Sequence, residues 1–187
     1  MPTLDATVGG ADANTYALDT PDGIILFDCG NGDTWDQIER RMVYWNLDPA
    51  RIAACFLTHA HLDHAGAAHL LKERGIPLYA HAEAAHAVAS GDLRCAGYLY
   101  HKTFHPTEVD HQLQDGQSID ILGQSIDVLH LPGHSRGCTA YKFTHEDHVI
   151  LVSGDVIGTL LAGDFGWSGS IDFDKAAYLD SLKRLAQ

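Results

Sequence analysis

The sequence predicts an α+β fold in which two β-sheets pack face to face and helices cover their outer sides. Apolar segments of strand length occur in pairs, and segments with helical spacing of apolar residues separate these pairs. The chain has 187 residues, of which 45% are hydrophobic and 20% charged, as expected for a globular protein with a substantial core. We therefore expect one domain over residues 1–187.

The first strand pair is predicted at residues 15–19 and 23–28, because Pro21 and Gly23 favour a turn between them. A helix should follow, since Thr34 and Gln37 have the spacing of a capping box. Its buried face is expected to consist of apolar residues at helical intervals, namely Trp35, Ile38, Met42 and Trp45.

The middle of the chain alternates strands and helices. Strands are predicted at residues 51–57 and 76–80, and helices between them and at residues 81–90. The first of these helices should end at Gly75. Residues 91–112 show no clear periodicity and are predicted to form an irregular loop near the functional site.

The last part of the chain is predicted to contain two hairpins and a closing helix. The first hairpin turns at Gly123-Gln124 and the second at Glu146-Asp147. Apolar residues at intervals of three predict a helix over residues 173–185. Alternating strand pairs and helices of this kind give the two packed sheets stated above.

The strongest functional signal is the segment Thr58-His59-Ala60-His61-Leu62-Asp63-His64. His59 and His61 are two residues apart, so both rings point to the same side of an extended segment. Asp63 and His64 follow where the next helix begins. Packing does not require so many imidazoles and carboxylates, and the segment therefore predicts a metal site with enough ligands to begin a second one.

Two further loops place potential ligands just after strands. His134 lies in Pro132-Gly133-His134, and Asp155 lies in Ser153-Gly154-Asp155. The glycines allow sharp turns that direct their neighbours into a shared cleft. Imidazole and carboxylate ligands suit zinc, iron or manganese, and the motifs themselves contain no cysteine that would demand a softer metal.

In their order along the chain, these motifs resemble those of the metallo-β-lactamase-fold hydrolase superfamily, and Asp28-Cys29-Gly30 matches its early Asp-x-Gly turn. The resemblance implies an αββα sandwich of two mixed sheets with helices on the outer faces. It also implies that one metal is held by His59, His61 and His134, and a second by Asp63 and His64, with Asp155 bridging both.

The resemblance further implies a reaction. A metal-bound hydroxide attacks a carbonyl, and Asp63 carries the proton. Aspartate at position 155, where the best-known zinc β-lactamases have cysteine, favours the glyoxalase II-like and lactonase-like branches. We therefore expect hydrolysis of a thioester, lactone or related activated acyl bond in a small molecule. Two zinc ions are the expected cofactors, and iron or manganese also fits.

One feature departs from the dinuclear members of the family, which supply a final histidine from a loop after the bridging aspartate. No histidine follows Asp155 in this sequence, and His148 is the last in the chain. We expect that the chain lacks the last strand and helix of the domain together with this ligand. The second site should then bind metal more weakly than the first.

Two other functions remain open from the sequence. The persulfide dioxygenases resemble this family but use a single iron held by two histidines and an aspartate, which would be His59, His134 and Asp155 here. Alternatively, the chain is an inactive metal-binding fragment. Among the other histidines, a solvated or capping role is expected for His81 and a structural role for His130, while Trp167 is a candidate for the wall of the cleft.

Composition excludes several classes of partner. A net charge of −13 disfavours nucleic acid. No apolar run approaches the roughly 20 residues needed to span a bilayer. The amino terminus lacks a secretory signal pattern, and the four cysteines are widely spaced, so we expect a cytoplasmic protein. The oligomeric state is left unassigned.

Overall fold

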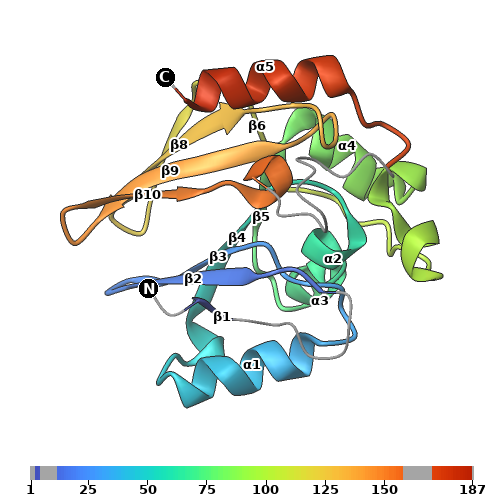
Figure 1. Cartoon of the computed structure of the whole chain (residues 1–187). Helices are drawn as coiled ribbons and strands as arrows, with labels where there is room; N and C mark the ends of the chain where they lie inside the picture. The colour runs from blue at the N-terminus through green and yellow to red at the C-terminus, as the bar shows by residue number, and fades with distance from the viewer. Residues whose placement is uncertain (1–2, 5–11, 158–169, 187) are drawn as a thin grey trace.

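Two β-sheets form the centre of the protein and helices cover their outer faces, as Figure 1 shows for the computed structural model. The structure describes residues 3–4, 12–157 and 170–186. In order, the layers are a group of helices, a six-stranded sheet, a four-stranded sheet and the C-terminal helix α5. The predicted α+β class and αββα arrangement are confirmed.

The six-stranded sheet is mixed. Its strands lie in sequence order: β1 (Thr3–Leu4), β2 (Thr15–Thr20), β3 (Gly23–Phe27), β4 (Ile52–Leu57), β5 (Leu78–His81) and β6 (His111–Leu113). The pairs β1–β2 and β2–β3 are antiparallel, and the remaining pairs are parallel. The parallel strands β3, β4 and β5 therefore all end at one edge of this sheet.

The four-stranded sheet is antiparallel throughout, so the expectation of two mixed sheets is wrong for this sheet; its strands follow one another through short connections, which favour antiparallel pairs. Its order is β10 (His148–Val152), β9 (Thr139–His145), β8 (Gln124–His130) and β7 (Ser118–Ile121). The register pairs Ile121 with Gln124, so the turn of the first hairpin is Leu122-Gly123, one residue earlier than predicted. Both turn residues have positive φ, which is the backbone that a tight two-residue hairpin requires.

Helices cover both sheets. The first sheet is covered by α1 (Trp35–Tyr44), α2 (Leu62–Ala65), α3 (Ala68–Glu73) and α4 (Ala82–Ser90), and the second by α5 (Lys175–Leu185). Short 3₁₀ turns occur at Pro49–Arg51, Leu93–Cys95, Gly97–Tyr100 and Gly154–Ile157. Residues 91–112 thus contain two 3₁₀ turns and the first two residues of β6 in place of a wholly irregular loop. No helix among the described residues is long and apolar enough to span a membrane.

Strand β3 shows why the core has two layers. All five of its residues are buried, as expected for a parallel strand covered on both faces. Ile24 and Leu26 pack with the helices, whereas Ile25 and Phe27 pack between the sheets. In the second layer the ring of Phe27 stacks on Phe143 with centroids 5.2 Å apart, which joins the two sheets.

Two expectations for helix α1 are wrong. Thr34 makes no side-chain cap, because its hydroxyl instead donates to the carboxylate of Asp12. Trp45 ends the helix and is 52% exposed, whereas Trp35, Ile38 and Met42 are buried as predicted. The apolar periodicity therefore predicted the face of the helix correctly and its last residue incorrectly. The loop that contains Trp167 lies outside the described residues.

Helix α4 begins with an unusual cap, in which Nδ1 of His81 accepts the backbone N–H of Glu83 at 3.3 Å. A histidine can accept at this nitrogen only when it is neutral. Burial, together with the nearby His130, lowers the pKa of His81 to about 4. The capping role predicted for His81 is therefore confirmed.

This cap makes a prediction about pH. Between about pH 6.5 and about 4 the unfolded chain takes up a proton at His81 and the folded chain does not, so the free energy of unfolding falls as the pH falls. His81→Gln should lower this free energy at neutral pH, and the gap to the parent should narrow towards pH 4. Urea unfolding across this range measures the gap, and a gap that stays constant would contradict the prediction.

Candidate metal centre

The two sheets bring the ends of several strands to one edge. Because β8 and β10 are both antiparallel to β9, both end at the same edge of the second sheet. Two hydrogen bonds attach this edge to the end of β4: the hydroxyl of Tyr141 donates to the carbonyl of Leu57 at 2.7 Å, and the backbone N–H of Thr139 donates to the carbonyl of Thr58 at 2.9 Å. The segments after β4, β8 and β10 therefore meet.

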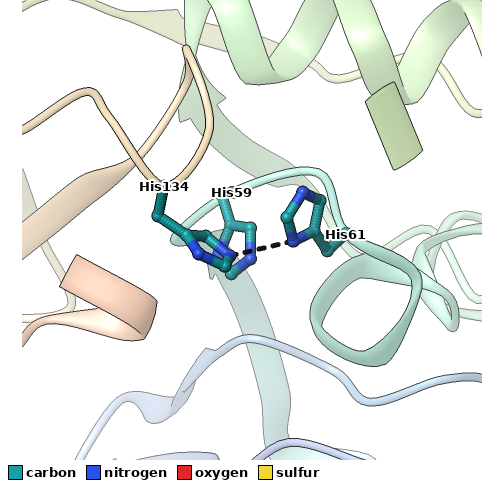
Figure 2. A group of neighbouring side chains, drawn as sticks. All are labelled: His59, His61 and His134. Atoms are coloured by element: carbon teal, nitrogen blue, oxygen red, sulfur yellow. Dashed lines mark hydrogen bonds between the residues drawn. The ribbon is translucent and has the colours of Figure 1, made fainter. Parts of the chain in front are cut away.

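Three histidines from these segments converge, as Figure 2 shows. His59 and His61 follow β4, and His134 follows β8. All three are buried, and one ring nitrogen of each lies within 4.8 Å of the other two. Nε2 of His134 is 3.0 Å from Nδ1 of His61. The structure thus brings together the three residues predicted to hold the first metal.

A second group shares one of these histidines. Ligand atoms of His59, His64 and Asp155 also lie within 4.8 Å of one another. Nε2 of His64 is 3.3 Å from Oδ1 of Asp155, and Nε2 of His134 is 3.4 Å from Oδ2 of Asp155. Asp155 therefore faces both groups with its two oxygens, which is the position expected for a bridging carboxylate.

Asp63 is less closely placed. Its Oδ2 is 3.7 Å from Nε2 of His64, but the close groups among the described residues do not include it. Its side chain is 18% exposed, so it is more accessible than the buried histidines. Tyr100 lies close enough to Asp63 that this carboxylate, together with burial, raises the pKa of its hydroxyl. Part of the 91–112 segment is therefore near the site, as predicted.

Hydrogen bonds fix which nitrogen of two histidines carries the proton. Oδ2 of Asp28 accepts from the hydroxyl of Thr58 at 2.8 Å and from Nδ1 of His64 at 2.7 Å. Since the Thr58 hydroxyl donates to Asp28, its oxygen can accept from Nδ1 of His59, 3.0 Å away. Protons on both Nδ1 atoms leave the Nε2 atoms of His59 and His64 as free acceptors.

These free nitrogens provide a test of whether a metal fits. Nε2 of His59 and Nε2 of His64 are buried and have no hydrogen-bond partner among the described residues, an arrangement that is costly unless something binds them. Two nitrogens on a tetrahedral zinc ion are about 3.3 Å apart, close to the 3.0 Å between His61 and His134. The donor set and its geometry therefore fit a transition-metal ion.

The charges of the site also favour a cation. Burial lowers the pKa of His59, His61 and His134, so these imidazoles are neutral and available as ligands. Burial opposes a charge on His64 as well, but the carboxylates of Asp155, Asp63 and Asp28 outweigh it and raise its pKa well above the usual value. The same carboxylates favour a cation at this position.

Asp28 is a candidate functional residue for which the sequence predicts no role beyond the Asp-x-Gly match. It is buried, has φ of 60°, and also accepts the backbone N–H of Thr58 at 2.7 Å. The available signal was a charged residue directly after a fully apolar strand and two residues before a glycine. Its contacts orient His59 and His64 in the manner of the outer carboxylates around metal-binding histidines.

Asp28→Asn tests this role. The amide can accept through one oxygen only, and its NH₂ group faces donors, so the orientation of His64 and of Thr58 is lost. We expect zinc affinity to fall about 10–100-fold and the free energy of unfolding to fall by about 1–3 kcal/mol. Titration calorimetry with zinc measures the affinity. Asp36→Asn, on the exposed face of α1, is the control, and equal affinities of the two variants would contradict this role.

Comparison with known proteins agrees with this geometry. Residues 8–187 match the model of the Metallo-beta-lactamase superfamily. The chain is 30% identical over 94% of its length, and 79% of the relative's, to a Bacillus subtilis protein named "Probable metallo-hydrolase YqgX". It is 33% identical to the hydroxyacylglutathione hydrolase of Aeromonas salmonicida, over 73% of this chain and 43% of that protein.

The fold is also found among solved structures. The FEZ-1 metallo-beta-lactamase of Legionella gormanii superposes with a TM-score of 0.75 at 24% identity, over 93% of this chain and 69% of that one. This likeness concerns the fold, whereas the match over residues 8–187 concerns the sequence that carries the histidines. The chain belongs to the metallo-beta-lactamase superfamily.

Proposed function

We propose that this protein is a metal-dependent hydrolase that cleaves a thioester, a lactone or a related activated acyl bond in a small molecule. The observation that carries the proposal is the convergence of five buried or half-buried ligand groups: His59, His61, His64, His134 and Asp155. The relatives with hydrolase names support the reaction class.

The residues of the site have two roles, which are to bind the cation and to transfer a proton. His59, His61 and His134 would hold one ion, and His64 with Asp155 would begin a second site to which Asp63 would add a ligand. A bound divalent cation supplies Lewis acidity towards the acyl carbonyl and lowers the pKa of water. The outer contacts from Asp28 and Thr58 keep His59 and His64 oriented before the substrate arrives.

Asp63 is assigned the proton transfer. Its carboxylate lies 3.7 Å from Nε2 of His64 and is 18% exposed, so it is accessible to both the reacting water and the leaving group. In this role it takes a proton from the attacking water and returns it to the departing sulfur or oxygen. An activated acyl bond suits such a site, because its leaving group needs only this one proton.

The choice of acyl bond rests on the relatives and on Asp155. A hydroxyacylglutathione is a thioester, and the hydrolase of that name is 33% identical to this chain over 138 residues. Asp155 provides an oxygen ligand where a thiolate would favour a softer metal environment. A thioester is therefore the first substrate class to test, and a lactone is the second.

The experiment loads the purified chain with zinc, iron or manganese and offers it an acylglutathione, an acyl-coenzyme A, a lactone and a β-lactam. We expect hydrolysis of the thioester or the lactone, its loss on chelation, and its return when metal is added. Absence of turnover on all four substrates in every metal form would overturn the proposal, and the chain would then be a metal-binding fragment without activity. Iron in the purified protein, with oxygen uptake on glutathione persulfide, would identify a dioxygenase instead.

A further inference from the structure

The imidazole of His134 is held differently from those of His59 and His64. The outer nitrogens of His59 and His64 contact Thr58 and Asp28, but Nδ1 of His134 is buried without a hydrogen-bond partner among the described residues. No described side chain therefore fixes the direction of this ring from behind. The position of its outer side therefore depends on the backbone of the loop that carries it.

That loop is closed by a side-chain hydrogen bond. Nε2 of His130, the last residue of β8, donates to the carbonyl of Arg136 at 2.8 Å. Residues 131–135 lie between these two partners, and His134 is among them. The bond therefore brackets the loop at its two ends. The loop is also held by the backbone N–H of Leu131, which donates to the carbonyl of Cys138 at 2.8 Å, and by the hydroxyl of Ser170, which donates to the carbonyl of His134 at 2.8 Å.

His130 is itself anchored by its backbone. Its N–H donates to Oδ1 of Asp115 at 2.9 Å, and its carbonyl accepts from Arg184 of helix α5 at 2.9 Å. Arg184 also pairs with Oδ1 of Asp115 at 2.9 Å, which closes the connection. The bracket is thus attached to helix α5 and to the segment before β7, and not only to its own strand.

The ring of His130 is supported from the other sheet. It stacks on the ring of His81, with centroids 3.7 Å apart and planes inclined by 8°. His81 ends β5 and caps α4, so the stack joins the first sheet to the start of the His134 loop. A stacked ring cannot rotate freely, and the stack therefore keeps Nε2 of His130 directed at Arg136.

We propose that His130 is a positioning residue for the metal centre, which sets the place of His134 through the His130–Arg136 bracket and so contributes to metal affinity. The inference rests on the proposed function only in that the site binds a metal ion. Hydrogen bonds to the outer nitrogen of a metal-binding histidine usually orient its ring. The hydrogen bond of His130 would serve the same purpose, but it acts on the backbone of the loop and not on the ring of His134.

Two variants of the same chemistry test the bracket. His130→Gln places an amide donor at nearly the reach of Nε2, whereas His130→Asn carries the same amide but is one methylene too short. Both side chains are polar and suit a partly exposed strand end. His148→Asn is the control, because His148 also contacts a nearby backbone carbonyl, that of Glu146 at 2.7 Å, but at a hairpin tip.

Metal affinity is measured at neutral pH by competition of zinc with a chromophoric chelator, and the visible absorption of the cobalt form reports ligand geometry. We expect His130→Asn to weaken zinc binding about 10-fold or more and to change the cobalt spectrum. His130→Gln and His148→Asn should resemble the parent. Equal affinity of the Asn variant and the parent would overturn the inference, as would an equal loss in the Gln and Asn variants.

The test of the positioning role of His130 can fail independently of the test of the proposed hydrolysis. If the Asn variant loses zinc affinity while no substrate is turned over, the positioning role stands and the proposed reaction fails. If turnover is found but zinc affinity is the same in all three variants and the parent, the reaction stands and the positioning role fails.

Discussion

Replacing His59 by alanine is expected to remove hydrolysis, with a loss of about 1,000-fold or more in kcat/KM. His59 is the residue common to both groups of ligand atoms, and it is fully buried with Nε2 directed at them. Its loss therefore weakens both metal positions at once. Metal content by mass spectrometry and turnover of the best substrate are the measurements.

His69→Ala is the control for this prediction. His69 lies on α3, and its Nδ1 contacts only the carbonyl of Gly66, at 3.1 Å, among the hydrogen bonds of the described residues. Its replacement should leave metal content and turnover close to those of the parent. A His59→Ala chain that folds, keeps its metal and turns over substrate normally would show that the site lies elsewhere.

Gly133→Ala is expected to have the largest effect on stability, at about 3 kcal/mol or more. Gly133 has φ of 141°, and an added Cβ would lie 2.2 Å from Cα of Tyr178 in helix α5. The His134 loop and helix α5 cannot easily separate to make room, because the carbonyl of Gly133 accepts a hydrogen bond from the backbone N–H of Asp174 at the start of α5. The substitution should displace α5 from the His134 loop.

Denaturant unfolding measures the loss of stability. This loss has two causes, backbone strain at positive φ and the clash with Tyr178, and Gly123→Ala separates them. Gly123 also has positive φ, at 73°, but an added Cβ there would meet no atom within 4 Å. That variant should lose only the cost of backbone strain, about 1–2 kcal/mol. If both alanine variants lose the same amount, the close approach of α5 does not limit position 133.

Much of the fold could be predicted because its signals are local. Helices and strands follow from apolar periodicity, and each turn from residues that favour it, as Gly123 does. The errors were of a different kind. Thr34 has the sequence of a helix cap, but its hydroxyl binds Asp12, a residue that is distant in the sequence and close only in the folded chain. Trp45 fits the helical spacing but falls where the helix ends.

In the candidate site, too, residues with local sequence signals could be predicted and residues that act through distant contacts could not. His59 and His61 could be identified because adjacent ligands leave a dense pattern in the sequence. Asp28 and His130 leave no such pattern. Each acts through one or two contacts with residues far away in the sequence or through a backbone carbonyl, and carbonyls are present at every position. Such contacts exist only after the sheets have packed.

The sequence by itself determined to which superfamily the chain belongs and predicted which residues carry the chemistry, since ligand type and spacing are properties of the chain. Only the tertiary structure decided how those residues meet. Packing of β4 against β9 brings His134 and Asp155 to His59, and the buried carboxylate of Asp28 directs His59 and His64 inwards. The physical reason is that a buried imidazole has two nitrogens, and the fold decides which of them is left free to bind a metal.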